Sequence, residues 1–409
     1  MDSLKSTDNI KITMDTVIIK IYGPNKFQFR NKTLFLPELS CRTYTDLSQT
    51  EIQSRNSTRS YLRKFILHPR PSDDYIPRVE VFETLSKESN RIIYILKITF
   101  SAPKLLYWNR VQEVDENDKQ KILSALKRAL ESIGIVVETE ILENATLEAV
   151  HACKNILLPK TMRMREILAE LGRMDISKVV DVMETQIKNG GRLLNFWSGT
   201  KEHCFYDKVS DSLKPKNKRS DKSRIDYEKV FIDQYKLQDR EIFRYEYRLK
   251  KTQTTRSVVN GLLDRKPDTP VIFKDLFTPD LIKNMIISSW HKLIERPENQ
   301  LSLFGKIDRL KLLLHIFSEA KKRGEKAHSM NNAFISYGIA TAILDNGVKE
   351  VRGIVYQGWN KDHPERLTKK IKTASELTDG LPYSNNIAFI DTELRKFELI
   401  SLTSLEKGI

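Results

Sequence analysis

Residues 241–250 read EIFRYEYRLK, and the strict alternation in this stretch decides the fold class. Successive side chains of a β-strand point to opposite faces, so the stretch predicts a strand with two different faces. One face carries charged side chains: Arg244, Glu246, Arg248 and Lys250. The opposite face carries Tyr245, Tyr247 and Leu249.

The stretches upstream of this strand predict further strands. Residues 193–198 (LLNFWS) and 202–208 (EHCFYDK) are separated by Gly-Thr-Lys, a length and composition that suit a β-hairpin. Residues 91–100 (RIIYILKITF) and 146–158 are rich in β-branched and apolar residues, which is typical of strands. Between these two, apolar residues recur at helical spacing over residues 118–133 and predict a helix.

The order of these elements predicts an α+β fold, with a central, largely antiparallel sheet joined to a helical C-terminal domain. Further expectations are a strand at 135–142, a largely helical stretch at 159–188, a short helix from 227, and helices at 255–263, 281–294, 303–320 and 332–344. We place the domain boundary at residues 264–270 (DRKPDTP), where the composition changes. The domains are then an N-terminal region of uncertain role at 1–90, with strands at 16–22 and 78–84, a sheet domain at 91–265, and a mainly helical domain at 271–409.

The charge of the chain indicates a polyanionic partner. Its 69 Lys and Arg against 54 Asp and Glu leave a net charge of +15, which favours nucleic acid or an anionic membrane surface. The most apolar stretch, residues 92–100, is far shorter than the roughly 20 residues of a membrane span, and the N-terminus shows no signal core. Three cysteines without CxxC spacing favour a reducing cytoplasm, and the absence of nucleotide-binding motifs leaves helicase work to a partner.

Three of the predicted strands concentrate reactive groups. Period two places Tyr206 with Lys208 on one face of its strand, and His151 on a face with Cys153 and Asn155 of another. If these strands share a sheet with 241–250, a tyrosine, a histidine, a glutamate and several cations meet on one surface. This grouping suits phosphoryl transfer to a tyrosine, because a phenol with a pKa near 10 needs a metal or cations to act as a nucleophile.

Two motifs carry a resemblance to a known family. Residues 205–208 (FYDK) end a strand, a charged insertion follows, and a strand with residues 244–250 (RYEYRLK) leads into a helix. In order and spacing the chain resembles the rolling-circle replication initiators of plasmids and phages, the trans-acting nickases, over roughly residues 90–265. The resemblance implies that the sheet domain is a nicking and joining nuclease domain.

The resemblance also implies a role for each site residue. Tyr206 would attack the scissile phosphate of origin DNA and keep it as a 5′-phosphotyrosine, while Lys208 and Arg248 offset developing charge. Glu246 would hold a divalent metal, Mg²⁺ or Mn²⁺, with His151 as a further ligand. The family's upstream strand typically reads Arg-x-Asp-x-x-x-Asp, whereas residues 149–155 (AVHACKN) have His and Asn at the acidic positions. The expected partners are single-stranded and duplex origin DNA, a host helicase and a second copy of the chain.

Candidate DNA contacts come from two basic regions besides the site itself. Residues 214–224 (KPKNKRSDKSR) carry six cations and one anion without apolar periodicity, which predicts a loop that follows phosphates. The predicted contacts are Lys214, Lys216, Lys218, Arg219 and, from the charged strand, Arg244. Residues 332–356 read helix, turn, helix, which fits either a DNA-binding helix-turn-helix with Lys349 and Arg352 toward DNA or a plain helical hairpin.

Every site residue also has a purely structural interpretation. Tyr206 can be an ordinary strand tyrosine, and His151 a hydrogen-bonded core residue. Glu246 between Arg244 and Arg248 can be part of a salt-bridge ladder on a solvated strand face. The alternative function is accordingly a non-enzymatic initiator or repressor that binds origin DNA and recruits host replication proteins, with its tyrosines stacking on bases.

Overall fold

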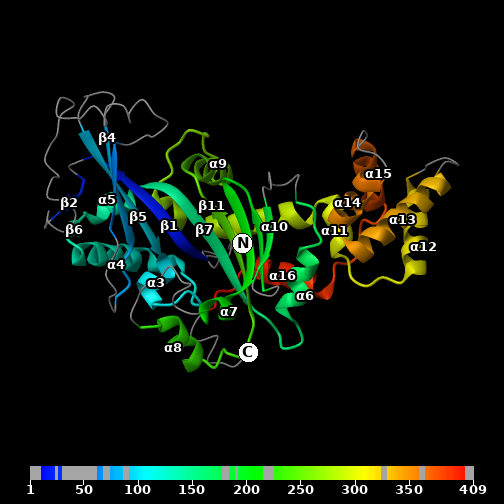
Figure 1. Ribbon diagram of the computed structural model, residues 1–409, viewed down its shortest axis with the longest axis horizontal. Coiled ribbons are helices and arrows are strands. Elements are labelled where there is room, and N and C mark those ends of the chain that lie inside the picture. Colours follow the sequence, from blue (N-terminus) through cyan, green and yellow to red (C-terminus); the bar gives the residue numbers. More distant parts are fainter. Residues whose placement is uncertain are drawn as a thin grey trace, which may run out of the picture.

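We analysed a computed structural model, which describes residues 11–23, 26–29, 62–67, 74–85, 92–176, 184–188, 192–214, 225–323, 329–358 and 364–400. Its main strands are β1 (Met14–Tyr22), β3 (Arg63–Leu67), β4 (Arg78–Leu85), β5 (Ile92–Ser101), β7 (Thr146–Leu157), β8 (Glu184–Lys188), β9 (Leu193–Trp197), β10 (Lys201–Asp207) and β11 (Ile242–Leu249). They form one nine-stranded sheet in the order β3-β4-β5-β1-β7-β11-β10-β9-β8, and every neighbouring pair is antiparallel. The prediction of an α+β fold with a central antiparallel sheet is confirmed (Figure 1).

Helices fill the connections and most of the C-terminal part. Before β11 lie α3 (Ala102–Tyr107), α4 (Lys119–Ser132), α5 (Thr139–Glu143), α6 (Met164–Leu171), α7 (Lys208–Ser212) and α8 (Tyr227–Gln234). After it come α9 (Thr252–Leu262), α10 (Leu281–Ile294), α11 (Pro297–Leu303), α12 (Arg309–Lys322), α13 (Ser329–Asn346), α14 (Val348–Gly358), α15 (Pro364–Glu376) and α16 (Asn385–Lys396). Within the described ranges, no helix has both the length and the apolar character of a membrane span.

Two local predictions are wrong. The strand expected at 135–142 is limited to β6 (Ile135–Val136), which pairs with β2 (Gln28–Phe29), and the chain then turns into α5. The stretch 159–188, expected to be largely helical, contains one helix, α6, within its described residues 159–176 and ends in the edge strand β8. For β6 the partner is the distant strand β2, whereas β8 pairs with the next strand along the chain, β9; in both places strand pairing decides the outcome and not the period of the residues.

The N-terminal region is part of the sheet instead of a separate domain. β1 lies between β5 and β7 in the middle of the sheet, and β3 and β4 extend it beyond β5. The predicted strands at 16–22 and 78–84 are confirmed as β1 and β4. As a consequence, Asp15 at the start of β1 reaches the charged residues of β11.

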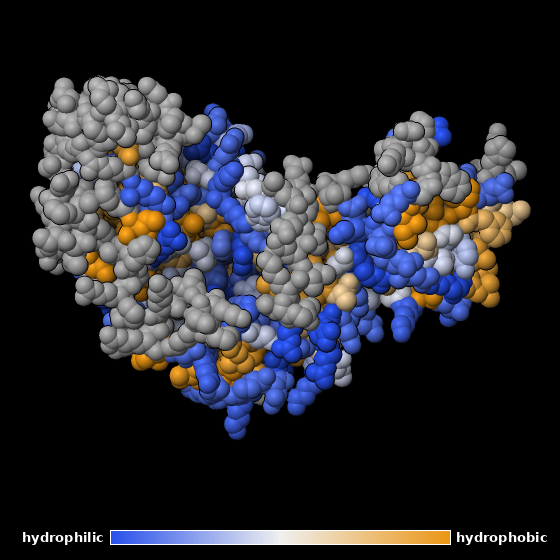
Figure 2. Space-filling view, in the orientation of Figure 1, coloured by the Kyte–Doolittle hydropathy of each residue, from blue (hydrophilic) through white to orange (hydrophobic). Residues whose placement is uncertain are grey.

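The hydrophobic packing divides the chain at a different place from the predicted boundary at 264–270. One core cluster joins the sheet to α4, α6, α10 and α16, whereas a second cluster is made by residues of α11–α15. The helical unit α11–α15 lies at one end of the molecule, beyond the sheet (Figure 1). Its surface carries apolar side chains, visible at the same end in Figure 2, and Leu310, Leu314 and Phe334 are more than half exposed.

The two faces of the sheet differ around β10 and β11. On one face, Trp290 of α10 packs against Phe205 and Tyr245, and its indole nitrogen donates to Asp391 of α16. On the other face lies the segment after α3. The main-chain oxygen of Arg110 in this segment accepts a hydrogen bond from Arg244. We call the first the aromatic face and the second the charged face.

Candidate active site

The predicted site residues come together on the charged face. β11 pairs with β10 on one side, with Tyr206 opposite Arg244, and with β7 on the other, with Arg248 opposite His151. Directly opposed residues of paired strands point to the same side, so the three strands present these groups on one surface. The expectation that a tyrosine, a histidine, a glutamate and cations share a face is borne out by this register, and Tyr245 and Tyr247 point to the aromatic face as predicted.

Tyr206 forms a short hydrogen bond with the central carboxylate. Its hydroxyl donates to Glu246 Oε1 at 2.5 Å, and the side chain is buried. Burial raises the pKa of the Tyr206 hydroxyl well above its ordinary value, and the negative charge of Glu246 adds to this shift although Arg244 opposes it. The phenol is therefore protonated at neutral pH in this arrangement, and its proton lies on the path to Glu246.

Glu246 is held between two guanidinium groups. Arg244 Nε donates to Glu246 Oε1 at 2.6 Å, and Arg248 Nη2 lies 2.5 Å from Glu246 Oε2. Burial opposes ionisation of this carboxyl, but Arg248 and Arg244 outweigh burial and hold the pKa of Glu246 well below its ordinary value. The salt-bridge ladder that the alternating charges permit does form, and Tyr206 is hydrogen-bonded to its centre.

Asp15 is a member of the site that the sequence analysis does not identify. It accepts a hydrogen bond from Ser101 Oγ at 2.6 Å and pairs with Arg244 Nη2 at 2.8 Å, with both side chains almost fully buried. Asp15 and Glu246 thus share the guanidinium of Arg244. The available signal is an acid at the start of a β-branched strand, since a buried carboxylate requires a cationic partner.

The alternation of charge continues toward solvent. Arg248 Nη1 lies 3.5 Å from Glu202 Oε1, and Lys250 Nζ lies 2.5 Å from Glu202 Oε2. The resulting charge ladder consists of Asp15, Arg244, Glu246, Arg248, Glu202 and Lys250. Side-chain exposure rises along its cations from 1% at Arg244 to 27% at Arg248 and 30% at Lys250. The ladder therefore has a dry end beneath Tyr206 and a wet end at Lys250.

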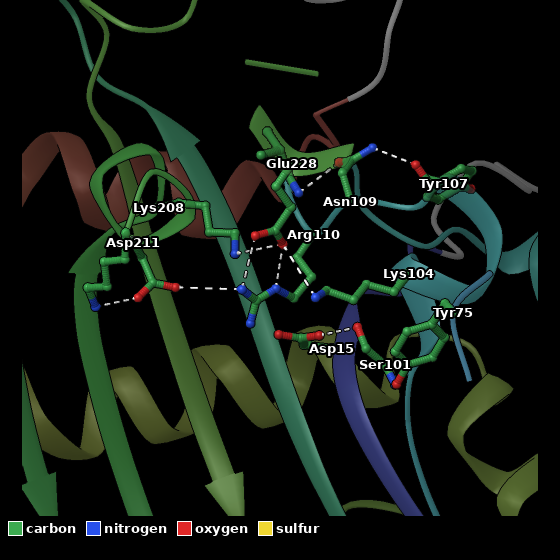
Figure 3. A network of polar contacts seen from close by, with 12 residues as sticks. Asp15, Tyr75, Ser101, Lys104, Tyr107, Asn109, Arg110, Lys208, Asp211 and Glu228 are labelled. Carbon is green, nitrogen blue, oxygen red and sulfur yellow. Dashed lines mark hydrogen bonds and ion pairs between the residues drawn. The ribbon is translucent and has the colours of Figure 1, made fainter. Parts of the chain in front are cut away.

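Lys208 belongs to a second polar cluster next to the ladder (Figure 3). Its ammonium is fully buried, has no hydrogen-bond partner among the described residues and lies 4.0 Å from Glu228 Oε1. Glu228 in turn binds Arg110 Nε at 2.6 Å. Burial lowers the pKa of Lys208 to about 8, and the nearby charge of Arg110 lowers it further. Lys208 adds positive charge next to the site, and the carboxylate that it pairs with belongs to Glu228 of α8.

A hollow of about 320 Å³ opens beside Tyr206. Its lining combines cations, acids and a hydroxyl: Arg192, Tyr206, Asp207, Ser210, Asp211 and Lys214. Lys214 Nζ lies 2.5 Å from Asp211 Oδ1, and Arg192 donates to Ser210 Oγ at 2.7 Å. The predicted DNA contact Lys214 is thus at the edge of the site, and Arg192 is a further cation there that the sequence analysis missed.

The remaining predicted DNA contacts fall into three groups. Arg244 is 1% exposed and bound by two carboxylates, so it is not a surface contact for DNA. Lys216, Lys218 and Arg219 lie outside the described residues. In the predicted helix-turn-helix, Lys349 is exposed on α14, but Arg352 is buried and pairs with Asp175. The prediction that Arg352 faces DNA is therefore wrong, because an acid from the segment after α6 neutralises it.

The predicted metal ligands do not form a ready cation site. Both oxygens of Glu246 already bind guanidinium groups, and Arg248 stands opposite His151 in the register. Burial lowers the pKa of His151 to about 4 and Arg248 lowers it further, against the opposing charges of nearby acids, so the imidazole is neutral and able to ligate. Among the residues that the structure describes, no three His, Cys, Asp or Glu side chains converge on one point. The divalent-ion requirement stays a prediction, and no step below depends on it.

Comparison of the chain with protein-family models, with curated proteins and with solved structures gives no match.

Proposed function

We propose that this protein nicks and rejoins origin DNA through a covalent link between Tyr206 and a 5′-phosphate. The observation that carries the proposal is the hydrogen bond of Tyr206 to a carboxylate that two arginines clamp, next to a cation-lined hollow. A tyrosine nucleophile requires a group to take its proton and cations to stabilise the phosphoryl oxygens. Glu246 and Arg248 supply these two requirements.

The reaction is a transesterification on a single-stranded segment of the origin. The Tyr206 oxygen attacks the phosphorus, the phenolic proton passes to Glu246, and the bond from phosphorus to the 3′-oxygen breaks. The 3′-oxygen leaves as a hydroxyl after taking a proton from solvent. The phosphotyrosine retains the energy of the phosphodiester, so attack by a 3′-hydroxyl reverses the step and rejoins the strand.

Substrate binding would also activate the base. In the free protein, Arg248 and Arg244 lower the pKa of Glu246, which makes it a poor acceptor of the Tyr206 proton. Arg248 is the more exposed of the two arginines, and a DNA phosphate offers it an equally good bidentate partner. When Arg248 turns to the phosphate, the pKa of Glu246 rises while Arg244 still positions its carboxylate.

The burial of Tyr206 favours a second candidate function. A hydroxyl that is already satisfied by Glu246 is also what a purely structural tyrosine would show. In that case the basic chain is a non-enzymatic origin-binding initiator or repressor, and its exposed cations and aromatic residues bind DNA without cleaving it.

A covalent-adduct assay separates the two functions. The protein is incubated with 5′- and 3′-labelled single-stranded origin oligonucleotides and Mn²⁺ or Mg²⁺, and the products are resolved by denaturing electrophoresis. A protein-bound label on the fragment downstream of the nick supports the nickase. Binding without any adduct, under conditions where the protein saturates the oligonucleotide, supports the alternative. Undiminished nicking in excess EDTA would exclude the predicted divalent-ion requirement.

A further inference from the structure

A tryptophan stands at the wet end of the charge ladder without a role in the core. Trp197 on β9 lies opposite Glu202 on β10, and in the same register Leu193 lies opposite Tyr206. Trp197 therefore shares the charged face with Tyr206. Its half-buried ring belongs to none of the hydrophobic clusters formed by the described residues, whereas Trp290 is fully buried in the main cluster.

The surroundings of Trp197 combine one carboxylate, Glu202, with two cations. Lys250 Nζ lies 5.4 Å from the ring centroid and 2.5 Å from Glu202 Oε2. Arg248 follows on the other side of Glu202 at 3.5 Å. An accessible aromatic ring beside partly exposed cations is the arrangement of single-strand-binding surfaces, in which bases stack on the ring and cations follow the phosphates.

We propose that Trp197 is the stacking platform for one base of the single-stranded substrate and that Lys250 binds the neighbouring phosphate. This inference rests on the proposed nicking function and adds a substrate contact to it. A stacked base contributes more than an exposed cation–π contact, so the base displaces the Lys250 ammonium from the ring. The ammonium then reaches the backbone of the same strand.

The position of Trp197 on β9 sets the distance between the stacked base and Tyr206. From residue 193, opposite Tyr206, to residue 197 the strand rises roughly 13 Å at about 3.3 Å per residue. The platform therefore holds a base beside the scissile phosphate and not the scissile nucleotide itself. One defined position of the oligonucleotide should depend on Trp197, whatever the base there, because every base has a face that stacks.

Equilibrium binding to oligonucleotides with single abasic sites tests the platform. The proteins carry Tyr206→Phe, so that no covalent product forms, and the probe is a fluorescein-labelled single strand of about 12 nucleotides followed by anisotropy. We expect Trp197→Leu to weaken binding by about 5- to 150-fold and Trp197→Phe to retain most of the affinity. An abasic site should weaken binding at one position in the parent, and this loss should vanish in Trp197→Leu.

Trp108 supplies the matched control. It is 37% exposed and its ring packs on Tyr227 at 4.8 Å, so it is the other accessible tryptophan among the described residues. Trp108→Leu should leave the abasic profile unchanged. Abasic profiles that coincide in the parent and in Trp197→Leu would overturn the platform, as would a position-specific loss that disappears in Trp108→Leu instead. Nicking is assayed separately with Tyr206 intact, so a platform without an adduct refutes the nuclease alone, and an adduct without the Trp197 effect refutes the platform alone.

Discussion

Two tyrosines on neighbouring strands, Tyr206 and Tyr245, show how the two faces of one sheet differ. Both are buried, both have a pKa raised well above the ordinary value chiefly by burial, and both hydroxyls are hydrogen-bonded. Tyr245 contacts neutral groups, His203 Nδ1 at 2.8 Å and Ser289 Oγ at 2.6 Å. Tyr206 contacts an ionised carboxylate. Burial and a raised pKa are therefore shared by a structural tyrosine and a candidate nucleophile, and the partner distinguishes them.

The environment beyond the hydroxyl strengthens the distinction. The ring of Tyr245 stacks on Phe205 at 4.7 Å and lies 6.0 Å from Trp290, so the aromatic face is closed by packing. The charged face is held by ion pairs that become more exposed along the ladder, and Tyr206 itself lines a hollow. Ion pairs can exchange partners with a phosphate, whereas a packed aromatic core cannot. Reactivity is thus expected on the charged face alone.

The largest expected effect is the loss of nicking when the hydroxyl of Tyr206 is removed, compared with removal of a tyrosine hydroxyl on the aromatic face. Tyr206→Phe should abolish nicking and adduct formation while DNA affinity stays nearly unchanged, because the change deletes the nucleophile and little packing surface. Tyr245→Phe and Tyr247→Phe should remain active. The measurement is the adduct assay alongside anisotropy with the same oligonucleotide. Full cleavage by the Tyr206 variant would exclude this tyrosine as the nucleophile. The tyrosines of the two faces would then not differ in reactivity.

The next effect concerns the carboxylate that orders the charged face. Glu246→Gln leaves two guanidinium groups without their shared anion, and we expect a loss of about 3–5 kcal/mol in the free energy of unfolding, with Asp15 limiting it. For His151→Ala we expect a smaller loss, about 1 kcal/mol in the free energy of unfolding. Nicking should also fall further in Glu246→Gln than in His151→Ala. Urea unfolding measures stability, and circular dichroism at the assay temperature confirms that the variants compared are folded. Equal nicking by the two folded variants would contradict a central role for Glu246.

The third prediction concerns how His203, on the aromatic face, makes the stability of the protein depend on pH. Burial lowers the pKa of His203 to about 3, well below the value near 6.5 of an unfolded chain. Between these values the unfolded chain binds a proton that the folded protein does not, so His203 makes stability fall as the pH drops below about 6.5. The contribution is about 1.4 kcal/mol per pH unit. His203→Gln should flatten the decline in unfolding free energy between about pH 6.5 and 4.5 by that amount, and parallel curves for the two proteins would show that His203 is not the group responsible.

Much of the central sheet is predictable from local alternation. The periodicity of residues 241–250 and of the hairpin 193–208 predicts strands, shows which groups share a face and separates Tyr206 from Tyr245. Helix α10 is predicted with its observed bounds, because its apolar spacing is strong. These features depend on residues within a few positions of one another, which is the range over which period and propensity act.

The remainder depends on pairing between distant segments. Nothing in residues 14–22 indicates that β1 enters the sheet between β5 and β7, and without that position Asp15 cannot be assigned to Arg244. The apolar spacing of α10 predicts a helix but not that this helix packs with the sheet and with α16, so the division between the hydrophobic clusters after α10 could not be placed from the sequence. Arg352 lies on a helix like a surface cation, and its pairing with Asp175, an acid distant in the sequence, could not be predicted.

The smallest effect compares two lysines that make the same local ion pair on opposite faces. Lys214 pairs with Asp211 at the edge of the hollow, and Lys396 pairs with Glu393 on α16, which packs on the aromatic side; both pairs span three residues. Exposed pairs of this kind contribute little to stability, so neither Lys214→Ala nor Lys396→Ala should change the unfolding free energy by more than about 0.5 kcal/mol. Their effects on DNA should differ. If single strands lie along the charged face, Lys214→Ala removes one phosphate contact, and the slope of log affinity against log salt should fall by about 0.7. Lys396→Ala should leave that slope unchanged. Equal slopes for both variants would mean that this lysine pair does not separate the faces, and that the attraction of the chain for DNA comes from its overall positive charge.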